Sequence, residues 1–159
     1  MRVLFVCTGN TCRSPMAQVM ASKIFNDLLI GGENTKIYEV VSAGVAAFDG
    51  ATASNHAITV MQEREIELDG HSARLITAEI MQEADLILAM TTGHKTALQR
   101  NFPDKEIHTL GEYVGSTKSV ADPFGGDLEI YRQCANEIHD LLVKLAERIL
   151  SGDSVSNPE

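Results

Sequence analysis

Short apolar runs alternate with longer amphipathic stretches along this chain. Four of the apolar runs have the length and residue types of strands, at residues 3–7, 37–41, 85–90 and 106–110. Between and after them, the spacing of apolar residues predicts helices over about 14–29, 52–65, 77–83, 92–101 and 127–150. This alternation predicts a single-domain α/β fold, with a four-stranded parallel sheet covered by helices on both faces.

Residues at the ends of these helices support the boundaries. We expect Ser14 to cap the first helix and Pro15 to take its first helical position, where a missing N–H costs nothing. Gly31 and Gly32 are expected to end that helix, and Thr77 to cap the third one.

The composition predicts one domain. A chain of 159 residues with 44% hydrophobic residues is long enough for one core but short for two, so we assign the domain to residues 1–150. Residues 151–159 have little to bury and are expected to form a disordered tail. Because no apolar run reaches the length of a signal peptide core or a membrane span, we expect a cytoplasmic protein that does not bind membranes.

Charge and cysteine content restrict the partners and the compartment. The 22 acidic and 13 basic residues give a net charge of -9, which repels nucleic acids and anionic lipids, so we expect neither as a partner. The three cysteines cannot all pair within one chain, which argues against a secreted disulfide framework. The sequence leaves the oligomeric state open.

Residues 7–14, Cys-Thr-Gly-Asn-Thr-Cys-Arg-Ser, lie directly between the first predicted strand and the first predicted helix. Ligands bind beyond the carboxyl ends of parallel strands, and a helix N-terminus attracts anions, so this segment is predicted to be a phosphate-binding loop. Gly9 and Asn10 readily adopt the positive φ angles that turn several N–H groups toward one centre. The segment has no lysine, which distinguishes it from the nucleotide-binding P-loop.

Two side chains of this loop indicate its chemistry. A helix N-terminus and a nearby guanidinium stabilise a thiolate, so we expect Cys7 to be a nucleophile at neutral pH. Arg13 can bind two phosphoryl oxygens at once, which a lysine cannot do. Together they predict phosphoryl transfer through a phosphocysteine.

A second loop, rich in Pro and Gly, precedes the last predicted helix. Its Asp122 is the best candidate for the acid and base, and its Phe124 is expected to form one wall of the pocket.

The combination of Cys7, Arg13 and Ser14 at the N-terminus with a late Asp122-Pro123 resembles the low-molecular-weight protein tyrosine phosphatase family. The resemblance extends over about residues 1–150, through segments 42–44, 70–74 and 84–90. It implies that Cys7 is the nucleophile and that Arg13 clamps the phosphate. It also implies that Ser14 donates its hydroxyl to the sulfur leaving the phosphoenzyme, and that Asp122 acts first as acid and then as base.

The same resemblance implies roles for residues around the loop. Asn10 is expected to be left-handed and held by hydrogen bonds involving Ser42 and His71, which keeps the loop preorganised. Cys12 is implied as the partner that traps oxidised Cys7 in a reversible disulfide. Cys12 as a small loop residue and His71 as a packing residue stay open as alternatives. The residues expected to bind phosphate or substrate are Thr8, Gly9, Asn10, Thr11, Cys12, Ser14 and Phe124.

Thr11 bears on the substrate. Tyrosine phosphatases of this family usually carry an aliphatic residue there, whereas the similar bacterial protein-arginine phosphatase branch carries threonine. Phosphoarginine presents N–H groups that need acceptors, which Thr11 and Asp122 could provide directly or through a water, while a phosphotyrosine ring favours an apolar wall. Only one aromatic residue, Phe124, follows Asp122-Pro123, where many tyrosine-specific members have two. We therefore expect phosphorylated proteins as partners and phosphoarginine as the hydrolysed group.

Other functions remain to be weighed. A tyrosine phosphatase shares the mechanism and differs only in the pocket walls. An arsenate reductase would use further cysteines in the middle of the chain, but none lies between Cys12 and Cys134, and Cys134 is better interpreted as a packing residue of the last helix. A phosphoresidue-binding module would not need both Cys7 and Asp122. The remaining histidines lack the spacing of metal ligands, so we expect neither a metal nor a cofactor: His56, His94, His108 and His139.

Overall fold

Four parallel strands form the sheet of this protein. The computed structural model describes residues 1–29 and 36–152. Within these residues the strand order is β2-β1-β3-β4, and the strands are β1 (Arg2–Cys7), β2 (Glu39–Gly44), β3 (Leu86–Ala89) and β4 (His108–Thr109). The predicted α/β fold with a four-stranded parallel sheet is confirmed.

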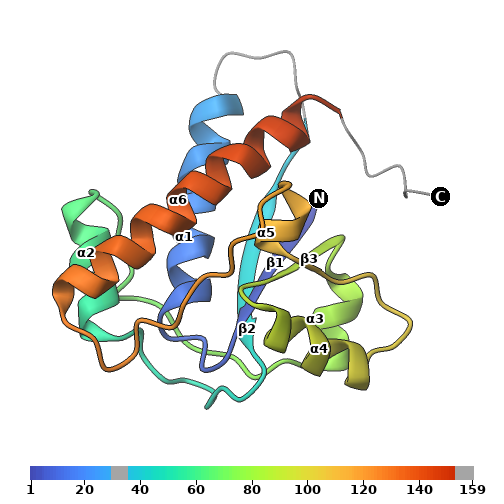
Figure 1. Ribbon diagram of the computed structural model, residues 1–159, viewed down its shortest axis with the longest axis horizontal. Coiled ribbons are helices and arrows are strands. Elements are labelled where there is room, and N and C mark those ends of the chain that lie inside the picture. Colours follow the sequence, from blue (N-terminus) through green and yellow to red (C-terminus); the bar gives the residue numbers. More distant parts are fainter. Residues whose placement is uncertain (30–35, 153–159) are drawn as a thin grey trace.

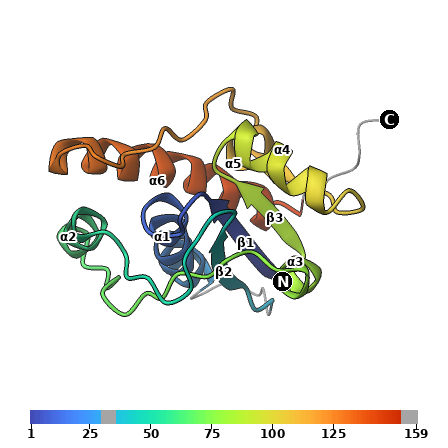
Figure 2. The same cartoon turned by 90° about the horizontal axis from the view of Figure 1, so that it is seen from below.

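Helices cover both faces of this sheet. On one side of β1 lie α1 and α6, and α2 packs against α6; on the other side lie α3 and α4 (Figures 1 and 2). The short helix α5 follows β4. The bounds are α1 (Arg13–Leu29), α2 (Asn55–Glu63), α3 (Ala78–Glu83), α4 (Thr92–Asn101), α5 (Leu110–Tyr113) and α6 (Leu128–Leu150). None of the helices in the described part of the chain is long and apolar enough to cross a membrane.

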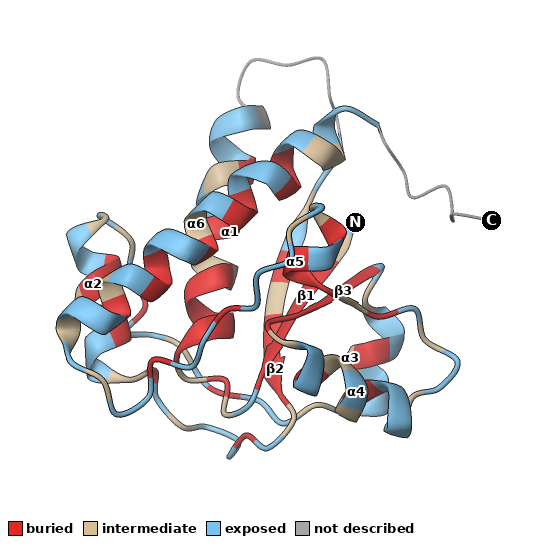
Figure 3. Ribbon diagram, in the orientation of Figure 1, coloured by how far each residue is buried: buried red, intermediate tan, exposed pale blue. Residues whose placement is uncertain are grey.

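The central strand β1 is buried on both faces (Figure 3). Because side chains alternate along a strand, Phe5 and Cys7 belong to the cluster formed with α1 and α6, whereas Leu4 and Val6 pack with the helices of the opposite face. Burial on both faces explains why this strand is an unbroken apolar run. It also places Cys7 at the end of the strand, on the same face as α1.

Hydrogen bonding shifts several predicted boundaries. The first helix already begins at Arg13, so the prediction that Ser14 is its cap is wrong; Ser14 lies in the first turn, where its hydroxyl contacts the loop instead. The second helix is shorter than predicted because Ser54 caps it by accepting a hydrogen bond from Ala57 N. Thr77 caps α3 as predicted.

Two strand predictions also need correction. The predicted strand over 37–41 is found at Glu39–Gly44, because pairing with β1 continues as far as Gly44. The predicted strand over 106–110 is reduced to two residues, because Thr109 and Glu112 form a reciprocal capping box that starts α5. The predicted end of the first helix at Gly31 and Gly32 lies outside the described residues. Residues 153–159 of the predicted tail also lie outside them.

The topology places a binding crevice at the end of β1. The connection after β1 leads to the edge strand β2, whereas the connection after β3 leads to β4 on the opposite edge. Ligands of open parallel sheets bind where neighbouring connections diverge in this way. Residues 8–12, which follow β1, and the turn into α4, which follows β3, therefore meet at one site.

Gly44 lies opposite Cys7 at this end of the sheet and has no room for a side chain. An added Cβ would be 2.4 Å from the carbonyl oxygen of Thr8 and 2.9 Å from the amide nitrogen of Asn10, both of which are backbone atoms. We expect Gly44→Ala to lower the free energy of unfolding by about 1 to 3 kcal/mol and to reduce phosphate binding. Urea unfolding and calorimetric titration with phosphate measure the two effects. Gly70→Ala is the control, since nothing lies within 4 Å of its added Cβ; equal behaviour of the two variants would contradict this account.

Candidate active site

The loop over residues 8–12 is held by the segment that follows β2. Val45 N donates to Cys7 O at 3.0 Å, Ala46 N donates to Thr8 O at 2.9 Å, and Ser54 N donates to Thr11 O at 2.9 Å. These bonds turn carbonyl oxygens of the loop toward the neighbouring segment. That is the arrangement a loop needs if its N–H groups are to face an anion.

Asn10 fixes the curvature of the loop. Its φ angle is 55°, in the left-handed region, and its side chain is fully buried. The amide nitrogen donates to Ser14 Oγ at 2.8 Å and to Ser42 Oγ at 2.9 Å, and the amide oxygen accepts from Arg74 N at 3.0 Å. The amide thus holds its own backbone in a conformation that most residues avoid. The left-handed conformation and the contact with Ser42 match the expectation.

His71 supports the same residue from the backbone side. Its Nε2 is 2.7 Å from Asn10 O, and because a carbonyl only accepts, the ring donates this hydrogen bond. Burial lowers the pKa of His71 below its ordinary value, which the bond to Asn10 only partly offsets. The contact expected between His71 and Asn10 is therefore present, with the ring neutral at pH 7.

Cys7 and Ser14 form a buried pair at the base of the loop. Cys7 Sγ lies 2.9 Å from Ser14 Oγ. Because the Ser14 oxygen already accepts from Asn10, its own proton is free to be donated to the sulfur. A hydroxyl that donates to a sulfur is suited to stabilise negative charge when it develops on that atom. The side chains of Asn10 and Ser14 lie behind the cavity wall and act through these bonds.

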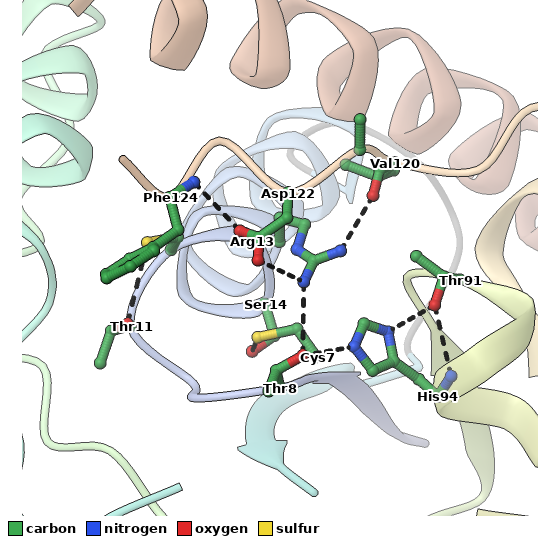
Figure 4. A network of polar contacts seen from close by, with 12 residues as sticks. Cys7, Thr8, Thr11, Arg13, Ser14, Thr91, His94, Val120, Asp122 and Phe124 are labelled. Atoms are coloured by element: carbon green, nitrogen blue, oxygen red, sulfur yellow. Dashed lines mark hydrogen bonds and ion pairs between the residues drawn. The ribbon is translucent and has the colours of Figure 1, made fainter. Parts of the chain in front are cut away.

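The guanidinium of Arg13 is almost fully buried beside Cys7, with 4% of its surface exposed. Nη1 donates to Val120 O at 3.1 Å, and Nη2 lies 3.5 Å from Thr8 Oγ1 and 3.6 Å from Asp122 Oδ2 (Figure 4). These acceptors come from the loop and from the segment that precedes α6. A buried cation with preset acceptors is suited to bind a phosphoryl group.

Asp122 reaches the site from the segment before α6. Its Oδ1 accepts from Phe124 N at 3.1 Å, while Oδ2 faces Arg13. The first bond is a local turn of a common kind, and it fixes the direction of the carboxylate. Asp122 is about half exposed, so water and a leaving group can both reach it.

Cys7, Arg13 and Asp122 border one cavity of about 250 Å³. Its walls are residues 7–9 and 11–13, which belong to the loop and to the adjoining ends of β1 and α1, together with Asp122 and Phe124. Phe124 is 80% exposed and lies near Thr11 at the rim (Figure 4). The structure therefore brings together the predicted nucleophile, guanidinium, carboxylate and aromatic wall.

The other cysteines differ in their surroundings. Cys12 Sγ lies 3.3 Å from Tyr131 Oη and 3.4 Å from Ser54 Oγ, and all three cysteines are free thiols. A disulfide between Cys7 and Cys12 stays a prediction. Burial raises the pKa of Cys134 to about 12, which keeps this thiol protonated and unreactive. That agrees with its interpretation as a packing residue.

A sequence model described as low molecular weight phosphotyrosine protein phosphatase matches residues 2–154. The chain belongs to this family. A protein-arginine-phosphatase of Geobacillus stearothermophilus is 43% identical over 151 residues, which cover 93% of this chain and 95% of that protein. The low molecular weight protein-tyrosine-phosphatase PtpB of Staphylococcus haemolyticus is 36% identical over 146 residues, which cover 91% and 97%.

A solved structure shows the same fold. It is a mutant of the YwlE arginine phosphatase with a phosphorylated active-site serine, and it is 39% identical to this chain with a TM-score of 0.88. The match covers 96% of this chain and 98% of the other. The family assignment and the shared fold are thus both supported over nearly the full length of this low-molecular-weight phosphatase.

His94 is a residue of this phosphatase site that the sequence analysis missed. Its Nε2 lies 2.8 Å from Thr8 Oγ1 and its Nδ1 lies 3.0 Å from Thr91 Oγ1 (Figure 4). The spacing of the histidines along the chain bears only on a metal site and does not indicate a role beside the loop. The informative signal was position, because His94 follows shortly after the predicted strand at 85–90 and so lies at the carboxyl edge of the sheet.

Burial, followed by the charge of Arg13, lowers the pKa of His94 to about 4, although Asp122 acts in the opposite direction. The unfolded chain therefore takes up this proton near pH 6.5, whereas the folded phosphatase takes it up only near pH 4. We expect His94 to reduce the free energy of unfolding by on the order of 2 kcal/mol as the pH falls from 6.5 to 4. Urea unfolding of the wild-type protein and of His94→Gln across this pH range measures the contribution of His94 to the pH dependence of stability. The carboxylates titrate in both proteins, so their contribution cancels in the difference. Identical pH dependence of the two proteins would contradict the assignment.

Proposed function

We propose that this protein is a protein-arginine phosphatase that hydrolyses phosphoarginine residues of proteins through a phosphocysteine intermediate. The observation that carries the proposal is the convergence of Cys7 Sγ, the buried Arg13 guanidinium and the Asp122 carboxylate on one cavity. A nucleophile, a clamp for phosphoryl oxygens and an acid are the three groups that this reaction needs.

In the first step, the Cys7 thiolate attacks phosphorus and the bond from phosphorus to the substrate nitrogen breaks. Arg13 and the N–H groups of the loop hold the phosphoryl oxygens as their charge redistributes. Protonated Asp122 gives its proton to the departing guanidine nitrogen. The products are a phosphocysteine and an unmodified arginine side chain.

In the second step, water attacks the phosphocysteine and Asp122, now ionised, takes a proton from that water. The bond from sulfur to phosphorus breaks and the electron pair returns to Cys7. Ser14 donates a hydrogen bond to the leaving sulfur at the short distance already present in the free protein. Inorganic phosphate then leaves the loop.

Thr11 supports phosphoarginine as the substrate. Thr11 lines the same cavity as Asp122, so the N–H groups of a guanidine bound there have a hydroxyl and a carboxylate as candidate acceptors. Two relatives named protein-arginine-phosphatase are 43% identical to this chain over 151 residues and 42% identical over 153 residues. The strongly exposed ring of Phe124 can also stack on a phosphotyrosine, which makes a tyrosine phosphatase the second candidate.

The remaining assignments follow from this function. We infer that Cys12 is the redox partner of Cys7, that phosphorylated proteins in the cytoplasm are the substrates, and that residues 1–150 form the catalytic domain. Arsenate reduction is disfavoured, because Cys134 is buried in α6 with Ala121 O as its polar neighbour and is thus unsuited to relay a disulfide.

Replacement of Thr11 tests the substrate class. We expect Thr11→Ile to lower kcat/KM for a phosphoarginine peptide by about tenfold, the equivalent of one lost hydrogen bond to a charged group, while the matched phosphotyrosine peptide is hydrolysed as well or better. Thr11→Ser keeps the hydroxyl and should keep the preference, and Cys7→Ser serves as the blank. If the reduced wild-type protein prefers phosphotyrosine, the enzyme is a tyrosine phosphatase and Thr11 is only a spacer.

Replacement of Asp122 tests the acid. We expect Asp122→Asn to reduce kcat/KM, which reports formation of the phosphocysteine, by about 10²-fold to 10⁴-fold on phenyl phosphate and to reduce kcat/KM much less on p-nitrophenyl phosphate, whose leaving group needs no proton. Asp127→Asn is the matched control, since asparagine also caps a helix and Asp127 accepts from Ile130 N at the start of α6. Equal losses of kcat/KM on both substrates would rule out Asp122 as the acid.

A further inference from the structure

A chain of polar contacts connects α4 with the phosphate-binding loop. It runs from Thr91 to His94, from His94 to Thr8, and from Thr8 to Arg13 (Figure 4). His94 is nearly as buried as Arg13, with 7% of its surface exposed. The mechanism described above uses neither His94 nor the hydroxyl of Thr8.

The chemistry of these side chains determines which atom donates and which accepts in each of these hydrogen bonds. Arg13 has only donors, so Thr8 Oγ1 accepts from its Nη2. The Thr8 proton can then be donated to Nε2 of His94, at 2.8 Å, if that nitrogen is unprotonated. Nδ1 of His94 then carries the ring proton and donates it to Thr91 Oγ1, which also accepts from His94 N at 3.3 Å. The donors on Arg13 Nη2, Thr8 Oγ1 and His94 Nδ1 thus each meet an acceptor.

A neutral ring is required for this arrangement. A protonated His94 would have donors on both nitrogens and could not accept from Thr8. It would also bring a second positive charge next to Arg13. Burial and the charge of Arg13 favour the neutral form, and the opposing charge of Asp122 has the smallest effect of the three.

We propose that His94 is a positioning residue for phosphate binding, which orients the Thr8 hydroxyl so that its oxygen holds the Arg13 guanidinium over Cys7. The inference rests on the proposed function only for the meaning of its kinetic readout. Hydrogen bonds to charged groups contribute more than neutral ones and align one another along a chain. Loss of the acceptor at His94 Nε2 frees the Thr8 hydroxyl to rotate and removes one restraint from Arg13.

A purely structural role for His94 makes a different prediction. His94 lies in the first turn of α4, where Thr91 is the cap, so its replacement could simply destabilise the helix. If stabilising the helix is the only role of His94, its replacement lowers the free energy of unfolding but leaves the dissociation constant of phosphate unchanged in the folded protein. A positioning role changes phosphate binding, and it does so through Thr8.

The test is a double-mutant cycle with His94→Leu and Thr8→Val, read out by calorimetric titration with inorganic phosphate and by kcat/KM on p-nitrophenyl phosphate. We expect each single variant to weaken phosphate binding by about tenfold, and the double variant to lose no more than Thr8→Val alone. His94→Gln, whose amide oxygen can accept from Thr8, should restore binding to within about threefold of the wild type. His108→Leu is the histidine control, because His108 pairs with Glu106 outside the cavity.

Several results would overturn the proposal. One is a folded His94→Leu protein with unchanged phosphate affinity, and another is a double variant whose loss equals the product of the two single losses. Nitrogen NMR of the His94 ring in the wild-type protein gives an independent test that needs no variant. We expect Nε2 to be unprotonated and Nδ1 to be protonated at pH 7. The opposite tautomer would contradict the proposed series of hydrogen bonds. Phosphate binding is measured without turnover, so a failure to hydrolyse phosphoarginine would refute the proposed function and leave this inference standing.

Discussion

The buried amide of Asn10 is the interaction on which the site depends. It satisfies two serine hydroxyls and one backbone N–H while its own backbone takes a left-handed conformation. Without these bonds, the loop would lose a buried polar network and relax toward more common dihedral angles. The position of Ser14 against Cys7 follows from the same amide, since it fixes which direction the serine proton points. The left-handed turn of the loop and the orientation of the Ser14 hydroxyl toward Cys7 therefore both depend on this amide.

The second constraint is the buried charge of Arg13. Burying a cation costs free energy unless acceptors replace its water. Here the acceptors are a backbone carbonyl, a hydroxyl and a carboxylate, and the two contacts to Nη2 are both long, at 3.5 and 3.6 Å. A phosphoryl group with its negative oxygens can improve on such long contacts. The free site is thus arranged around a charge that its substrate satisfies better than the protein does.

Much of this could be predicted from the sequence, because the essential chemistry is local. Cys7 and Arg13 lie six residues apart between a strand and a helix, and the alternation of strands and helices defined the sheet. Features that depend on long-range contacts could not be predicted in this way. Ser14 was assigned as a helix cap because serine usually is one, but the contact with Cys7 depends on how the loop curls. His94 was missed because a single histidine carries no pattern, and its contact with Thr8 exists only once β3 lies beside β1.

The central claim is that the phosphoryl group passes through Cys7, and trapping the intermediate tests it most directly. In Asp122→Asn, p-nitrophenyl phosphate still forms the phosphoenzyme because its leaving group needs no acid, but water attack is slowed because the base is gone. Rapid acid quenching followed by peptide mass analysis should find one phosphoryl group on the peptide that contains Cys7, and none in the variant that also carries Cys7→Ala. Turnover of this substrate with no phosphate on Cys7 at any quench time, or with phosphate on another residue, would contradict the account.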